Sequence, residues 1–302
     1  MASGHHLVRL LVLLVAGLVS GTLAYGATDP SALLHMLDYV GVDYPNTVRD
    51  RQVVDAAEYD EQLEFSEQII QRVRELPATP SQPALQERAA ELATLIRDKA
   101  DGAQVSALAD ELRLAIMDAY PVAAAPRRLP DLAGAATLYR NHCAACHGAE
   151  GYGDGPQAAG LEPPPNNFHD TERQFQRSLY GLYNTISLGV EGTAMVGFSQ
   201  LSEEERWALA FYVGSFPFTA EQREKGAELW QRQADWDLKT LTTLTPNQIA
   251  ARHGDNGLSV LAYLRSQPAV LAVQGETPLR FSARKLDESL ARYQVGDGKA
   301  AY

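Results

Sequence analysis

The sequence contains one Cys-x-x-Cys-His motif, Cys143-Ala-Ala-Cys146-His147, and no cysteine outside it. Two thiols at this spacing, followed at once by a histidine, are the attachment signature of a c-type haem. Each thiol bonds one vinyl group of the porphyrin, and the adjacent imidazole reaches the iron as its proximal ligand. The motif therefore predicts one covalently attached haem c, tethered by Cys143 and Cys146 and ligated by His147.

The alternatives for this motif are a zinc ribbon and a thioredoxin-like dithiol. A zinc ribbon needs a second pair of cysteines or histidines at suitable spacing, and the sequence has none. A thioredoxin-like dithiol is the remaining alternative, but the following histidine and the export signal described below argue against it. His142 precedes the tether, so we interpret it as a surface residue at a helix end.

The sixth iron ligand can be predicted by counting methionines. The chain has four, and only Met195 follows the motif, in the flexible segment Gly192-Thr-Ala-Met-Val-Gly197. A thioether opposite His147 would favour reduced iron and give the His/Met arrangement of electron-transfer cytochromes. His169 is the competing ligand, and a methionine that fills a core gap is the structural alternative.

The first residues predict export. A basic start up to Arg9 precedes the apolar run 10–19, and small residues follow, with cleavage expected after Gly26 or Ala27. We therefore expect a periplasmic protein; an uncleaved signal acting as a membrane anchor is the alternative. The net charge of −12 argues against nucleic acid and against an anionic membrane surface as the main partner.

Apolar residues at helical spacing predict an all-α protein. We expect a class I cytochrome c domain flanked by an N-terminal helical hairpin or bundle and by a C-terminal helical segment. Within the N-terminal part, helices are expected over 31–40, ending at Gly41, and over 57–76. Two further stripes of apolar residues at helical spacing follow. The predicted units are a signal peptide (1–27), a helical domain (28–120), a linker (121–130), a cytochrome c domain (131–218) and a helical segment (219–302).

We call the predicted cytochrome c domain, residues 131–218, the haem unit. Helices are expected in it over 131–142 and 203–214, and a Ser202/Glu205 capping box begins the second. Further helices are expected over 220–232, 256–265 and 279–293, with prolines, including Pro246, as interruptions and residues 253–257 as a turn.

Carboxylates concentrate on the predicted helix 57–76. Neighbours three residues apart, Glu58/Glu61 and Glu61/Glu64, could share a hard cation such as iron or calcium. No histidine joins them in a Glu-x-x-His pattern, so a solvated helix face is the favoured interpretation. We interpret His35 and Met36, in the first predicted helix, as packing or surface residues.

Residues Cys143 to Tyr212 resemble a class I cytochrome c domain. By that resemblance Gly155-Pro156 corresponds to the family's Gly-Pro, and the Pro156 carbonyl would accept a hydrogen bond from the second nitrogen of His147. Such a bond fixes the ring and raises its basicity. The sequence departs from the family at the crossing of the two long helices, where Ala135 replaces the usual glycine.

A closer resemblance covers nearly the whole mature chain. Its residues are Leu37-Asp-Tyr-Val-Gly-Val-Asp-Tyr-Pro45, Glu162-Pro-Pro-Pro-Asn-Asn-Phe-His-Asp170, Leu182-Tyr-Asn-Thr-Ile-Ser-Leu-Gly-Val-Glu-Gly-Thr-Ala-Met195 and Glu205-Arg-Trp-Ala-Leu-Ala-Phe-Tyr-Val213. These strings resemble the periplasmic portion of bacterial cytochrome c-fused iron permeases. The family's permease domain, with its Arg-Glu-x-x-Glu motif, is absent from these 302 residues. We therefore expect a permease partner, in cis in a longer product or in trans.

Three functions follow as hypotheses. The first is a periplasmic electron-transfer module coupled to iron uptake, as the resemblance implies. The second is a general respiratory electron carrier with a helical extension. The third is a haem enzyme such as a peroxidase, which needs an open coordination site and is disfavoured by a Met195 ligand.

Overall fold

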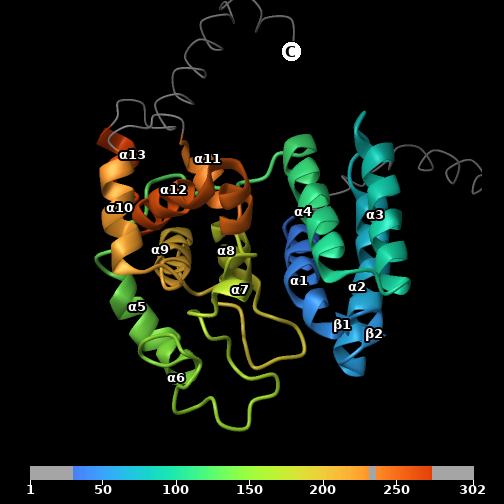
Figure 1. Cartoon of the computed structure of the whole chain (residues 1–302), viewed down its shortest axis with the longest axis horizontal. Coiled ribbons are helices and arrows are strands. Elements are labelled where there is room, and N and C mark those ends of the chain that lie inside the picture. Colours follow the sequence, from blue (N-terminus) through green and yellow to red (C-terminus); the bar gives the residue numbers. More distant parts are fainter. Residues whose placement is uncertain (1–29, 231–235, 274–302) are drawn as a thin grey trace, which may run out of the picture.

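The computed structural model describes residues 30–230 and 236–273, and this part of the chain is mostly helical (Figure 1). The predicted signal peptide and the predicted helix over 279–293 lie outside the described residues. Two short strands, β1 (Val48–Arg49) and β2 (Gln52–Val53), form an antiparallel ribbon at one end of the N-terminal helices. The all-α prediction is confirmed.

The N-terminal helices form a four-helix bundle. They are α1 (Ser31–Thr47), α2 (Ala56–Glu75), α3 (Gln82–Arg97) and α4 (Gly102–Ala119). The apolar stripes that predicted these helices are buried in a shared core, where Leu92, Ile96 and Leu112 have no exposed surface. Of the hairpin and the bundle that the sequence allowed, the bundle is therefore correct.

The prediction that α1 ends at Gly41 is wrong, because the helix continues to Thr47. Gly41 faces α4, where a Cβ placed on it would lie 3.6 Å from the Cβ of Ala109. The Ser106 hydroxyl of α4 donates a hydrogen bond to the Gly41 carbonyl. Gly41 therefore lies within α1, in ordinary packing contact with α4, and does not end the helix.

The middle of the chain contains five helices. They are α5 (Ala135–His142), α6 (Ala144–His147), α7 (Thr171–Gln174), α8 (Leu179–Leu188) and α9 (Glu203–Gly214). The capping box at Ser202 and Glu205 is confirmed. Helix α5 begins four residues later than expected and packs against α9, with Ala135 and Tyr139 fully buried.

The C-terminal helices cover the haem unit. They are α10 (Ala220–Trp230), α11 (Leu238–Thr243), α12 (Pro246–Ser266) and α13 (Val270–Val273). Pro246 does not interrupt a helix, because it occupies the first turn of α12, where its missing N–H costs no hydrogen bond. The expected turn at residues 253–257 is a bend inside α12, centred on Gly254.

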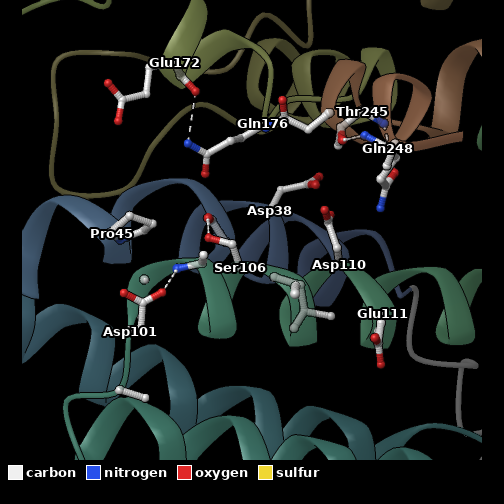
Figure 2. A pocket seen from close by; sticks show the side chains of 18 of the residues that line it. Asp38, Pro45, Asp101, Ser106, Asp110, Glu111, Glu172, Gln176, Thr245 and Gln248 are labelled. Carbon is white, nitrogen blue, oxygen red and sulfur yellow. Dashed lines mark hydrogen bonds between the residues drawn. The ribbon is translucent and has the colours of Figure 1, made fainter. Parts of the chain in front are cut away.

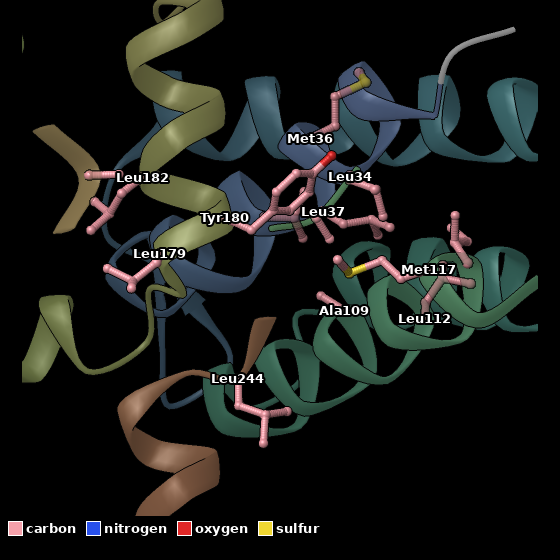
Figure 3. Packing of buried hydrophobic residues seen from close by; sticks show 14 of the residues in the cluster. Leu34, Met36, Leu37, Ala109, Leu112, Met117, Leu179, Tyr180, Leu182 and Leu244 are labelled. Carbon is pink, nitrogen blue, oxygen red and sulfur yellow. The ribbon is translucent and has the colours of Figure 1, made fainter. Parts of the chain in front are cut away.

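An apolar interface joins the bundle to the haem unit through α1 and α8. Tyr180 of α8 points toward Leu34 and Leu37 of α1, and Met117 of α4 lies beside them (Figure 3). All four side chains are buried. The bundle therefore shares one continuous hydrophobic core with the helices that follow the motif.

Buried charges hold the same interface. Arg113 of α4 has no exposed side-chain surface, and its guanidinium lies 3.2 Å from Asp38 of α1 and 3.0 Å from Asp110. It also donates a hydrogen bond of 3.0 Å to the carbonyl of Thr243 at the end of α11. Burial alone would lower the pKa of Arg113, but Asp38 and Asp110 raise it overall, so the group is charged.

A second set of ion pairs lies one turn further along α1. Asp43 pairs with Arg173 of α7 and lies 3.9 Å from Arg177, which precedes α8. The Asp43 side chain is 7% exposed and that of Arg177 is 11% exposed. Water therefore screens these pairs little, and removing one partner would leave an uncompensated buried charge.

Replacing Arg113 with methionine should lower the free energy of unfolding by about 3–5 kcal/mol, because Asp38 would remain buried without a cation. Chemical denaturation followed by far-ultraviolet circular dichroism measures this change. The matched control is Arg88→Met, which breaks the exposed Arg88–Glu111 pair and should cost less than about 1 kcal/mol. Equal losses in the two variants would contradict the role given to Arg113.

Candidate haem site

The Cys-x-x-Cys-His motif lies on two short consecutive helical segments. Cys143 follows α5 and caps its C-terminal end, where its N–H donates to the Tyr139 carbonyl at 2.8 Å. The same residue caps the N-terminal end of α6, where its carbonyl accepts from the His147 N–H at 2.9 Å. One helical turn therefore carries both thiols and the imidazole on a single short element.

The glycine-rich segment after the motif wraps back over α6. The N–H groups of Gly153, Gly155 and Gln157 donate to the carbonyls of His147, Cys146 and Ala145 at 2.8, 3.1 and 2.8 Å. These bonds satisfy the C-terminal carbonyls of α6 that no helical partner reaches. We call residues 148–157 the motif loop.

Gly155 is the point where the motif loop approaches α6 most closely. A Cβ placed on Gly155 would overlap the backbone carbonyl oxygens of Ala145 and Ala144. These neighbours are backbone atoms, so no side chain can move aside to make room. Glycine at this position is therefore a packing requirement of the loop.

The His147 ring is held by two contacts. Its Nδ1 lies 3.2 Å from the backbone oxygen of Asn166, which can only accept, so Nδ1 carries the proton. The Phe168 ring stacks on the imidazole with centroids 4.6 Å apart. Burial lowers the pKa of His147, although the bond to Asn166 raises it. A neutral ring with Nδ1 engaged leaves the Nε2 lone pair available to a metal.

The expected hydrogen bond from His147 to Pro156 is therefore corrected. Asn166 accepts the Nδ1–H, and no bond between Pro156 and His147 is found in the described part of the chain. The reason is local: the N–H groups on both sides of Pro156 tie the loop to the α6 backbone, while the segment after the proline run reaches His147. The bond that orients the ring is the expected kind, but its acceptor differs.

The two cysteines lie on one short turn together with His147, and both are half-buried. Burial raises the pKa of the Cys143 thiol, and the neighbouring Cys146 adds to the shift. This arrangement fits two tethering positions beside one metal donor.

Met195 lies on a tight hairpin, residues 189–196, which we call the Met195 hairpin. Gly189 and Val196 form a β-bridge, and the Val190 N–H donates to the Met195 carbonyl at 2.8 Å. The Met195 N–H donates to the Thr193 hydroxyl at 3.1 Å. Just after the hairpin, the Phe198 ring lies 6.0 Å from that of His142, which ends α5 beside the motif. The fold therefore brings the hairpin to the motif region.

His169, the competing ligand, is occupied elsewhere. Its Nε2 lies 2.7 Å from the Glu150 carbonyl, and its ring stacks on Tyr152 with centroids 4.2 Å apart. It also follows Phe168, which covers the His147 ring. His169 is therefore engaged beside His147, and Met195 remains the candidate sixth ligand.

The surroundings of the motif fit a covalently bound haem. Leu188, just before the Met195 hairpin, and Val196, its last residue, are 52% and 64% exposed. Large apolar side chains exposed together mark a surface that a ligand covers. A flat apolar macrocycle tethered to Cys143 and Cys146 meets this need, and His147 supplies the metal donor.

The carboxylates of the acidic helix α2 lie partly within the bundle and partly in solvent. Glu58 accepts hydrogen bonds from Tyr39 and Gln62, at 3.0 and 2.9 Å. Partial burial and the neighbouring carboxylates of Glu58 and Glu64 raise the pKa of Glu61. Within residues 30–230 and 236–273, no group of three or more His, Cys, Asp or Glu side chains is arranged to hold a metal ion. Glu61 and Glu64 are exposed, as a solvated helix face requires.

A cleft of about 830 Å³ opens where α1 and α4 face α7 and α12. Asp38 and Asp110 lie at its edge, while Gln176, Thr245 and Gln248 line the opposite side (Figure 2). The two carboxylates share the single cation of Arg113, which offsets one of their two negative charges. We interpret the cleft as a seam between the bundle and the helices that it packs against.

Comparison with known protein families gives two matches. Residues 132–217 match the cytochrome c family, and residues 27–123 match the iron permease-associated 4-helix bundle domain. The chain therefore carries a cytochrome c domain fused to an iron permease-associated four-helix bundle. No curated protein and no solved structure matches the chain.

These matches support an electron-transfer haem protein with a link to iron. A cytochrome c domain implies covalently bound haem c and one-electron transfer, in agreement with the geometry around Cys143, Cys146 and His147. The iron permease-associated bundle points to iron handling and to a permease or another iron-related partner. In the described ranges, no helix is long and apolar enough to cross a membrane.

Replacing Gly155 with alanine should displace the motif loop from α6 and lower the free energy of unfolding by about 1–3 kcal/mol, the usual cost of overpacking. Denaturation of the haem-bound protein measures the loss, and haem staining after denaturing electrophoresis measures attachment. Gly134→Ala is the matched control, because a Cβ on Gly134 meets no atom within 4 Å. A Gly155→Ala protein as stable as this control would contradict the close approach.

Proposed function

We propose that the protein is a periplasmic cytochrome with one haem c that transfers single electrons in ferrous and ferric iron handling beside an iron permease. The observation that carries this proposal is the fusion of an iron permease-associated bundle to a cytochrome c domain in one chain. The buried pairs of Asp43 with Arg173 and Arg177 support a fixed arrangement of the two units. A partner that binds the bundle would thus meet the haem at a defined position.

The number of haems in the proposal rests on the motif. The 302 residues contain one Cys-x-x-Cys-His sequence, so we assign one haem c, tethered by Cys143 and Cys146. When bound, it supplies the Fe(III)/Fe(II) couple. The periplasmic location rests on the export signal predicted over residues 1–27.

In this proposal the protein provides two neutral iron ligands. His147 is held as the neutral tautomer by Asn166 and Phe168, so its Nε2 is oriented before the iron binds. Met195 supplies a soft thioether from the hairpin, which favours the reduced state of the iron. Two protein ligands leave no open position for peroxide, and this favours electron transfer over peroxidase chemistry.

Met195→Ala should remove the sulfur-to-iron charge-transfer band from the ferric spectrum and lower the reduction midpoint of the haem, because a ligand that favours ferrous iron is lost. Met36→Ala, in the bundle, is the matched methionine control and should leave the spectrum unchanged. An unchanged ferric spectrum in Met195→Ala would overturn the ligand assignment.

Mixing the oxidised protein with ferrous iron in a stopped-flow instrument should reduce the haem, with a rate that rises with the iron concentration. The absorption of the reduced haem follows the reaction. Reduced respiratory carriers serve as the comparison donors. Rapid exchange with those carriers and none with ferrous iron would reject the iron-linked proposal in favour of a general respiratory carrier.

A further inference from the structure

His35 connects the bundle to the Met195 hairpin. It lies on α1, and its Nε2 is 3.1 Å from the backbone oxygen of Gly189. A carbonyl oxygen only accepts, so Nε2 carries the proton and donates it. Gly189 ends α8 and is the first residue of the hairpin. One side chain of the bundle thus reaches the base of the segment that carries Met195.

The backbones of Gly189 and Met195 are in close contact. Gly189 has a φ of +79°, and a Cβ placed on it would lie 2.6 Å from the Met195 carbonyl oxygen. A side chain is excluded there both by the left-handed backbone and by this close approach. The hydrogen bond from Val190 to Met195 closes the same ring of atoms. A contact that fixes the Gly189 carbonyl therefore also fixes the backbone of Met195.

The environment of His35 favours the neutral ring, whose single N–H donates to the Gly189 carbonyl. Its Nδ1 is buried and has no hydrogen-bond partner among the described residues. Burial and the Arg177 cation lower the pKa of His35, against the opposing effect of the Gly189 carbonyl. The ring is therefore neutral, with its one N–H directed at the hairpin.

The hairpin has little else to hold it against the bundle. Its other hydrogen bonds lie within the hairpin or join it to α8, as when the Thr193 hydroxyl donates to the Val190 carbonyl. Throughout residues 30–230 and 236–273, no second hydrogen bond joins the bundle to residues 189–196. Val196, at its end, is largely exposed.

We propose that His35 is a positioning residue for the sixth iron ligand: it fixes Gly189, and through it the Met195 hairpin, so that the bundle controls how tightly the iron is held by the thioether. This inference rests on the proposed ligation by Met195. A partner that shifts α1 would then change the reduction midpoint of the haem, which gives the bundle a direct influence on electron transfer.

The test uses the full haem-bound chain and two readouts, imidazole binding to the ferric haem and the reduction midpoint. His35→Ala should raise the affinity for imidazole about three- to tenfold, the change expected when one hydrogen bond is lost. The midpoint should fall in the same variant, because the thioether is held less firmly. His35→Gln keeps a side-chain N–H and should restore most of both values.

Tyr44→Phe is the control for general loosening of the bundle. It removes a buried hydrogen bond of 2.9 Å from Tyr44 to the Ala100 carbonyl, which involves no residue of the hairpin. This variant should lose thermal stability and keep the wild-type imidazole affinity and midpoint. If it reproduces the effect of His35→Ala, a specific role for His35 is excluded.

Met195→Ala in the same assays separates the two proposals. If it alters the ferric spectrum while His35→Ala binds imidazole like the wild type, the inference about His35 is wrong and the ligation by Met195 stands. If Met195→Ala leaves the spectrum unchanged, the proposed ligation itself fails, and the inference fails with it.

Discussion

The guanidinium of Arg113 is the contact on which the arrangement of the whole chain depends. It is fully buried and binds carboxylates of α1 and α4 together with the last carbonyl of α11. Each of these groups would be costly to bury alone, so the helices that carry them must come together in one register. In the same way, the ion pairs of Asp43 join α1 to α7 and to the segment before α8. We interpret these charges as selecting one orientation of the bundle, while the shared apolar core supplies the attraction.

This orientation matters because the bundle and the haem unit meet along α1. Residues 35, 39 and 43 follow one face of that helix at intervals of four. His35 contacts the Met195 hairpin, Tyr39 contacts Glu58 of α2, and Asp43 contacts the arginines before α8. A single helix face thus touches the acidic helix on one side and the haem unit on the other.

The sequence predicted the type of cofactor and most of the helices, because both depend on residue type and on the spacing of residues along the chain. The motif defined the cofactor, and the apolar stripes of α2, α3, α4 and α9 defined their buried faces. Glycine and proline were less informative. Gly41 lies within a helix that packs against α4, and Pro246 begins a helix because its missing N–H is harmless there. Their meaning depends on tertiary neighbours that local patterns do not reveal.

Hydrogen bonds accepted by backbone carbonyls could not be predicted from the sequence for the same reason. The acceptor for His147 is Asn166 rather than Pro156, and the acceptor for His35 is Gly189. Any residue can provide a backbone carbonyl, so neither acceptor can be recognised from its residue type. The pairing of Arg113 with Asp38 joins residues from different helices, and only the folded bundle brings them together.

The close packing of the motif loop on α6 links the loop to the position of the motif. The loop is held by hydrogen bonds from the N–H groups of Gly153, Gly155 and Gln157. Their acceptors are the carbonyls of His147, Cys146 and Ala145, which belong to the motif itself. A displacement of the loop would therefore move the tethering and ligating residues with it, and a haem carried by those residues would move as well.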